Sequence, residues 1–370
     1  MRKLRVFVTL ILIAGLLFTG CGSQESPQNT NSPSSNPSGS SNPPNEKPVK
    51  IVTVGNPLGS VAFIDEIYEG LELARDELGI EFEYVEVEEI ADYETQGRFL
   101  AETGEYDLII FVNSQLADIV KTIAEDYPEQ KFTLADSKLE GVANVHSVSA
   151  RDPEQHFLSG VISGIVTMGK YKDAFPMSND ANVLGYVGGS ESPISRSGAA
   201  GFIAGAKYVN PDVNVLYTIL NSYTDPAGGK EIALTAIAKG ADVVTGNCGA
   251  GIIGILEACK EQKSYYIATS IADNDVDQSL CSSVKKADKL IYNEVQSFVE
   301  GNWKAGYSTL GMKEGICDVS LENLAIEDKY PQEILDVVDE IRQMVVNGEL
   351  ELPYDPNEID EWCANNKYQW

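Results

Sequence analysis

From residue 49 onward, short apolar runs rich in β-branched residues alternate with amphipathic stretches, and no other feature of the chain constrains its fold as strongly. Between the runs, apolar residues recur at helical spacing, as in Ile64, Ile67, Leu71 and Leu78. Continuous apolar strands separated by helices form parallel sheets that are covered on both faces, so the alternation predicts an α/β protein. Ten runs have the length and composition of strands: 49–56, 81–87, 108–113, 132–136, 145–149, 183–189, 213–221, 243–248, 266–269 and 280–284.

The pattern restarts near residue 181, which predicts two doubly wound parallel-sheet lobes of similar topology. A glycine-containing loop at 55–60 leads into a helix, and a second loop at 188–193 does the same. We assign 49–175 and a return segment near 280–320 to the first lobe, and 180–278 and a C-terminal helix to the second. Ligands of such sheets bind at the carboxyl ends of the strands, so two facing lobes are expected to share one cleft.

The N-terminus has the features of an export signal over residues 1–20. Arg2, Lys3 and Arg5 precede an apolar stretch at 6–18 that is too short to span a bilayer core of about 30 Å. The sequence F-T-G-C at 18–21 resembles the end of a bacterial lipoprotein signal, which implies that Cys21 is lipidated and becomes the new N-terminus. An ordinary secretory signal with an incidental cysteine is the alternative.

Residues 22–48 contain no aliphatic or aromatic side chain and are rich in Ser, Asn and Pro. Such a segment cannot bury enough apolar surface to offset its ordering entropy, so a disordered tether is expected. Two or three acyl chains on Cys21 would hold the protein stably at a membrane. We therefore expect a lipid-anchored protein on the extracytoplasmic face of the cell membrane, in contact with the membrane through this anchor only.

The charge and the motifs of the chain argue against several classes of function. A formal charge of −29 opposes binding to nucleic acid or to anionic headgroups. The G-x-G-x-x-G sequence at 249–254 lacks the ribose-binding acid that a dinucleotide site needs after the next strand. The S-x-x-K sequence at 282–285 lacks its partner motifs. We therefore expect no cofactor, no metal and no enzymatic activity.

The cysteines leave the question of disulfides open. The count beyond Cys21 is odd, and an exported location permits disulfides without fixing which residues pair. The five residues concerned are Cys248, Cys259, Cys281, Cys317 and Cys363.

Several stretches taken together resemble the basic membrane protein family of substrate-binding lipoproteins, which includes purine nucleoside receptors of ABC-type importers. They cover most of residues 49–353 in a consistent order. The resemblance implies a type I periplasmic-binding architecture. The stretches are Y-E-G-L at 68–71, Y-P-E-Q-K-F at 127–132, L-A-D-S at 134–137, F-L-S-G at 157–160, G-Y-V-G-G at 185–189, G-F-I-A-G-A-K-Y-V-N-P-D at 201–212, N-S-Y-T-D-P-A-G-G-K-E at 221–231, G-A-D-V-V at 240–244 and S-V-K-K-A-D at 283–288.

The resemblance also implies a ligand site. Tyr223 matches an aromatic that stacks on the base, and Leu58 is taken as its non-stacking partner in the first loop. Asp136 matches an acid that accepts bonds from the base, Lys285 a lysine that holds the sugar, and Gly249 a glycine near the sugar. The candidate set is completed by Asn56, Asn113, Asn247 and Ser270, which lie in the first loop or at the ends of predicted strands.

Two departures from the family pattern leave the ligand open. The ribose-binding segment reads A-T-S-I-A-D at 268–273, with Ser270 in place of an acid, and the first loop lacks its usual acids and its final Asn, where Ile64 stands. Losing such groups changes specificity strongly. We expect a monomeric solute-binding protein that delivers a small polar ligand, a nucleoside or purine, to ABC permease subunits. A ligand sensor on the same fold is the alternative.

Overall fold

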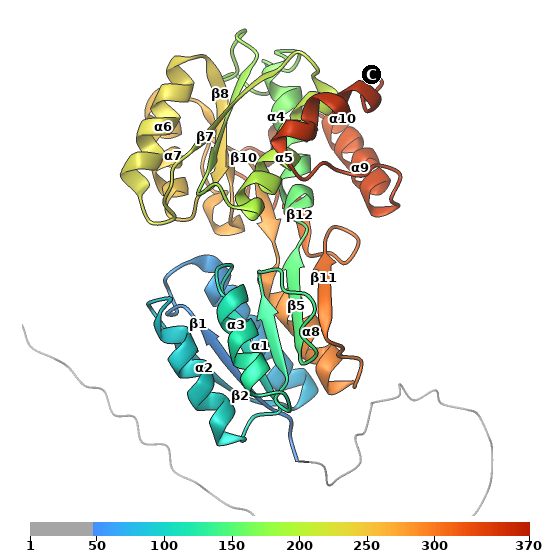
Figure 1. Ribbon diagram of the computed structural model, residues 1–370. Coiled ribbons are helices and arrows are strands. Elements are labelled where there is room, and N and C mark those ends of the chain that lie inside the picture. Colours follow the sequence, from blue (N-terminus) through green and yellow to red (C-terminus); the bar gives the residue numbers. More distant parts are fainter. Residues whose placement is uncertain (1–46) are drawn as a thin grey trace, which may run out of the picture. The chain divides into compact units, whose positions relative to one another are not determined.

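The computed structural model describes residues 47–370, and the predicted signal, Cys21 and nearly all of the predicted tether lie outside the described residues. The described chain contains two six-stranded sheets with the strand orders β11-β5-β4-β3-β1-β2 and β12-β10-β9-β8-β6-β7. All neighbouring strands are parallel except β10 and β12, which are antiparallel. Helices flank the strands (Figure 1). The α/β class with two doubly wound lobes is confirmed, and the two strand orders correspond position by position.

The first lobe is built mainly from the N-terminal third of the described chain. Its strands β1 and β3 are mainly apolar and are buried except at Lys50, as expected for strands covered on both faces. Its elements are β1 (Lys50–Gly55), α1 (Ala62–Leu78), β2 (Glu81–Glu86), α2 (Asp92–Thr103), β3 (Leu108–Val112), α3 (Ala117–Asp126), β4 (Phe132–Ala135), β5 (Val145–Ala150), α8 (Ala287–Val299) and β11 (Gly306–Leu310).

The second lobe repeats this arrangement. Its helix α6 begins as its sequence dictates, since Asp225 caps the Gly228 amide and Pro226 is the first helical residue. Its elements are α4 (Asp152–Thr167), β6 (Val183–Gly188), α5 (Pro193–Val209), β7 (Asn214–Ile219), α6 (Pro226–Ala238), β8 (Ala241–Asn247), α7 (Gly251–Gln262), β9 (Tyr265–Ala268), β10 (Ser279–Lys285), β12 (Cys317–Ser320), α9 (Gln332–Val346) and α10 (Ile359–Asn365).

The chain passes between the lobes at three places: between β5 and α4, between β10 and α8, and between β11 and β12. The observed lobe limits differ from the expected ones. Helix α4 packs against α5, β10 and β12, so the first segment of the first lobe ends with β5 at Ala150 and not near 175. The segment that returns to the first lobe is α8 and β11, whereas β10 and β12 belong to the second sheet.

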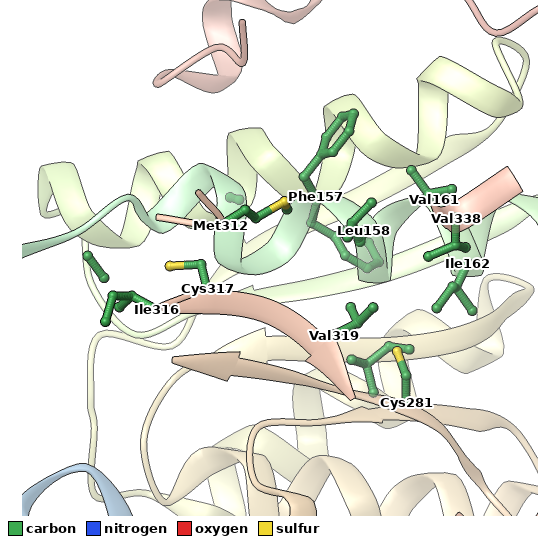
Figure 2. Close-up of a cluster of buried hydrophobic side chains, with 14 of the residues drawn as sticks. Phe157, Leu158, Val161, Ile162, Cys281, Met312, Ile316, Cys317, Val319 and Val338 are labelled. Atoms are coloured by element: carbon green, nitrogen blue, oxygen red, sulfur yellow. The ribbon is translucent and has the colours of Figure 1, made fainter. Parts of the chain in front are cut away.

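Helix α4 is buried along its whole length, which explains why it lacks an amphipathic pattern. Phe157, Leu158, Val161 and Ile162 of α4 lie in a cluster with residues of β10, β12 and α9 (Figure 2). Because α4 starts at one of the passages between the lobes, this packing holds that passage against β10 and β12 of the second sheet.

The five cysteines whose pairing the sequence left open are free in the structure. Among the described residues, no helix combines the length and the apolar character needed to cross a membrane.

Candidate functional site

In the first lobe, the predicted residues at the ends of β1 and β3 contact each other directly. Asn113 Nδ2 donates to Asn56 Oδ1 at 3.2 Å. The buried Tyr93 hydroxyl donates to the same oxygen at 3.3 Å, and the Tyr84 hydroxyl donates to the Asn56 carbonyl at 2.8 Å. This network fixes Asn56 and Asn113 at the carboxyl edge of the sheet, where doubly wound folds bind ligands.

An ion pair connects residues that are far apart in the sequence, Asp136 and Lys285. Lys285 Nζ lies 2.9 Å from Asp136 Oδ1, and both side chains are largely buried, with 15% and 17% exposed. Asp136 follows β4 and Lys285 ends β10, so the pair joins the first sheet to the strand that precedes a passage between the lobes. Asp136 also adopts a left-handed φ of 62°, a strained conformation that is common at functional sites.

The electrostatics around this pair follow from burial. Burial alone would lower the pKa of Lys285, but the carboxylates of Asp136 and Asp152 outweigh it and raise the pKa, so Lys285 stays charged. Burial, only partly offset by Lys285, raises the pKa of Asp152 to about 7. Burial and then Lys285 lower the pKa of His156 to about 3, so this imidazole is neutral.

An aromatic ring lies beside Lys285, but it is not at the predicted position. Lys285 Nζ is 4.6 Å from the centroid of Phe63, the second residue of α1, an arrangement that favours a cation–π interaction. Leu58 lies in the preceding loop, where its amide donates to Glu86 Oε1 and its side chain is 40% exposed. No role was predicted for Phe63 from the sequence. Phe63 nevertheless stands in the first-loop segment that differs from the family pattern, one residue before Ile64.

In the second lobe, Tyr223 lies against glycine backbone. A Cβ on Gly189 would come within 2.2 Å of the Tyr223 ring, and a Cβ on Gly249 within 2.4 Å of its carbonyl oxygen. Gly249 has a φ of +54°, and the amide of Ala250 donates to the Tyr223 carbonyl at 2.9 Å. The Tyr223 hydroxyl lies 3.0 Å from Ser190 Oγ, and 37% of the residue is exposed, which leaves ring surface for a partner.

Asn247 and Ser270 lie at the carboxyl ends of β8 and β9. The Asn247 carbonyl accepts from the Gly189 amide at 2.8 Å, so it supports the loop under Tyr223. Ser270 caps a short 3₁₀ turn through its hydroxyl, and its carbonyl accepts from Ser282 Oγ at 3.0 Å. Ser270 therefore has a local structural role at the position where the family pattern has an acid.

The structure thus forms two groups of candidate residues at the carboxyl ends of the strands. One contains Asn56, Asn113, Asp136, Lys285 and the unpredicted Phe63, and the other contains Tyr223, Gly249, Asn247 and Ser270. Among the described residues, no cluster of three or more His, Cys, Asp or Glu side chains has the arrangement needed to hold a metal ion. The arrangement can hold a planar, polar molecule through ring faces, a carboxylate and an ammonium group.

Comparisons with known proteins show which proteins this chain is similar to. An uncharacterized lipoprotein of Pyrococcus abyssi is 28% identical over 313 residues, covering 78% of this chain and 75% of that protein. The ABC transporter nucleoside-binding protein BmpA of Lactococcus lactis is 25% identical over 327 residues, covering 82% and 88%.

A solved structure with the same fold is an ABC transporter solute-binding protein of Aeropyrum pernix, with a TM-score of 0.72, 24% identity and coverage of 85% of this chain and 96% of that one. The family model described as ABC transporter substrate-binding protein PnrA-like matches residues 48–355. The resemblance read from the sequence is confirmed, and the protein belongs to the Bmp family of ABC transporter substrate-binding proteins.

Proposed function

We propose that this substrate-binding protein captures a purine nucleoside or a free purine between its lobes and delivers it to an ABC permease, as a monomer and without catalysis. The observation that carries the proposal is the buried Asp136–Lys285 pair beside the Phe63 ring. The name of the nucleoside-binding relative from Lactococcus lactis supports the same ligand class.

The chemistry of a purine fits the groups present. Its flat face can stack on Phe63 and on the exposed surface of Tyr223, an interaction worth about 1–3 kcal/mol per aromatic. Its N–H groups can donate to Asp136, and its acceptor atoms or a sugar hydroxyl can accept a hydrogen bond from Lys285. The Lys285 ammonium group has two N–H donors beyond its bond to Asp136. Ser270 offers only a hydroxyl where the family pattern has a carboxylate, so we propose weaker selection for ribose than for the base.

Titration calorimetry tests this proposal. The full chain in detergent should bind at least one of adenosine, guanosine, inosine or their free bases in a saturable manner. Free bases should bind within about tenfold of the nucleosides, which corresponds to about 1.4 kcal/mol. If no purine compound binds at millimolar concentration, the purine assignment is wrong.

We further propose that Cys21 carries the lipid anchor and holds the domain on the extracytoplasmic face of the membrane. The resemblance of residues 18–21 to a lipoprotein signal and the lipoprotein names of relatives support this. Cys21→Ala should abolish lipid labelling and release the protein from membranes, with Cys363→Ala as the control. Unchanged labelling and membrane fractionation of Cys21→Ala would rule out this anchor.

A further inference from the structure

Asp152 is a buried acid for which the predicted site has no role. It is the first residue of α4, directly after the chain leaves the first lobe, and it is 7% exposed. Its Oδ1 has no hydrogen-bond partner within the described residues. Burying an unpaired polar oxygen is costly, and more so when the carboxyl group is ionised. The position therefore needs a physical explanation.

Packing holds the start of α4 next to Lys285. Lys285 pairs with Cys317 across the β10–β12 ladder, and Cys317 Sγ lies 3.6 Å from the carbonyl oxygen of Arg151, the residue before Asp152. Two turns further along α4, Ser159 Oγ accepts a hydrogen bond of 2.7 Å from Ser283 Oγ of β10. Asp136 is paired with the Lys285 ammonium group, and Asp152, from a different chain segment, lies close enough to act on the same group electrostatically.

The other ionisable groups around Asp152 do not supply a competing cation. Arg151 is held by Glu154 at 3.1 Å and by Glu314 at 3.5 Å, on the neighbouring passage between β11 and β12. His156, one turn further along α4, is neutral. Asp152 interacts electrostatically with ionisable groups of several elements: Lys285 of β10, Asp136 after β4, Cys317 of β12, Tyr186 of β6, and Tyr354. Glu154 and His156 follow it on α4.

We propose that Asp152 is the alternative counter-ion of Lys285, and that ligand binding moves Lys285 from Asp136 to Asp152, with release of the proton to solvent from those Asp152 carboxyl groups that carry one. The inference rests on the proposed function. In the free protein Lys285 Nζ lies 2.9 Å from Asp136 Oδ1, and an N–H group of the bound ligand must replace Lys285 as the donor to this oxygen. The ammonium group keeps its three protons throughout, and only the Asp152 O–H bond is broken.

The direction of the proton transfer follows from the environment. Burial keeps part of the Asp152 population protonated at neutral pH, since it raises the pKa to about 7. A closer ammonium group stabilises the carboxylate and lowers its pKa, so a proton leaves. The exchange would also link ligand binding to α4, the first element of the second lobe.

Calorimetry in buffers of different ionisation enthalpy tests the inference. The full chain in detergent is titrated at pH 7 in phosphate and in Tris. The ligand is whichever of adenosine, guanosine, inosine and their free bases binds best. The wild type should release a fraction of a proton per bound ligand, and the release should decline above pH 8, where Asp152 is already ionised. Asp152→Asn should bind without release, whereas Asp152→Glu should retain it.

Asp242→Asn is the matched control. Asp242 is also buried and also has an unpartnered Oδ1, but it lies at the amino end of β8, so this variant should release protons like the wild type. Binding by the wild type without proton release, or release that persists in Asp152→Asn, would overturn the inference alone. No binding of any purine by the wild type would overturn the proposed function and this inference with it.

Discussion

The residues of the candidate site are held by hydrogen bonds to partners that are near in the sequence in some cases and far away in others. Asn56 is fixed by Tyr84, Tyr93 and Asn113, all within the first lobe. Asp136, in contrast, bonds to Lys285, which lies 149 positions further along. The contacts of Asn56 therefore depend on one lobe alone, whereas the Asp136–Lys285 pair depends on both sheets.

We expect Phe63→Ala and Tyr223→Ala each to weaken purine binding by about 1–3 kcal/mol, because each removes one stacking face. Leu58→Ala should change the affinity less than either, since an aliphatic side chain offers no ring for stacking and the bond to Glu86 is made by the backbone amide of Leu58. Phe99→Ala, an exposed position on α2, is the control for loss of an aromatic. An unchanged dissociation constant for Phe63→Ala, measured by calorimetry, would contradict the placement of the base beside this ring.

The stability of the ligand-free protein should depend on pH through Asp152. Its pKa is about 7 in the folded state and near 3.9 when unfolded, so the folded state binds the extra proton between these values. The free energy of unfolding therefore falls as pH rises from 4 to 7, by up to about 4 kcal/mol from this group. Relative to the wild type, Asp152→Asn should gain melting temperature between pH 5 and pH 8. A constant difference across this range would show that Asp152 does not titrate there.

At the scale of elements, the strands were predictable and the limits of the lobes were not. All ten predicted strands are present, because each is rich in β-branched, aliphatic or aromatic residues over a suitable length. Strands β11 and β12 were missed, since they are short and carry polar residues at the lobe passages. Helix α4 was given to the wrong lobe because its sequence is apolar on every side and does not show which sheet it covers.

The contact between α4 and α5 depends on glycine. A Cβ on Gly205 would lie 2.0 Å from the Phe157 carbonyl oxygen, a backbone atom that cannot turn away. Gly205→Ala should therefore destabilise the fold by about 1–3 kcal/mol through overpacking, despite the better helix propensity of alanine. Lys121→Ala on the exposed side of α3 should stay within about 0.5 kcal/mol of the wild type. Urea unfolding measures both, and equal stability of Gly205→Ala and wild type would contradict this packing.

At the scale of the whole molecule, the sequence predicted the architecture and the family better than the site. The repeated strand order follows from local patterns that occur twice in the chain. The bond between Asp136 and Lys285 could not be read from spacing, because it forms only when two sheets are assembled; their joint role came from the family resemblance alone. The proposed roles of Phe63 and Asp152 were not predicted. Both residues stand at the start of a helix, and the sequence does not indicate which residues of other elements such a position contacts.

The central claim is that a purine ligand is held between the two lobes. Because such a ligand would draw the lobes together, a distance measurement between them tests the claim most directly. Thr95 of α2 and Thr235 of α6 are exposed and lie near the edges of the sheets that are far from the three passages. Spin labels on Thr95→Cys and Thr235→Cys in the full chain allow pulsed electron spin resonance, with the unsubstituted chain as the labelling control. The account predicts that a saturating purine ligand shortens the distance between the labels by several ångström. A saturated purine complex with the same distance distribution as the free protein would contradict it.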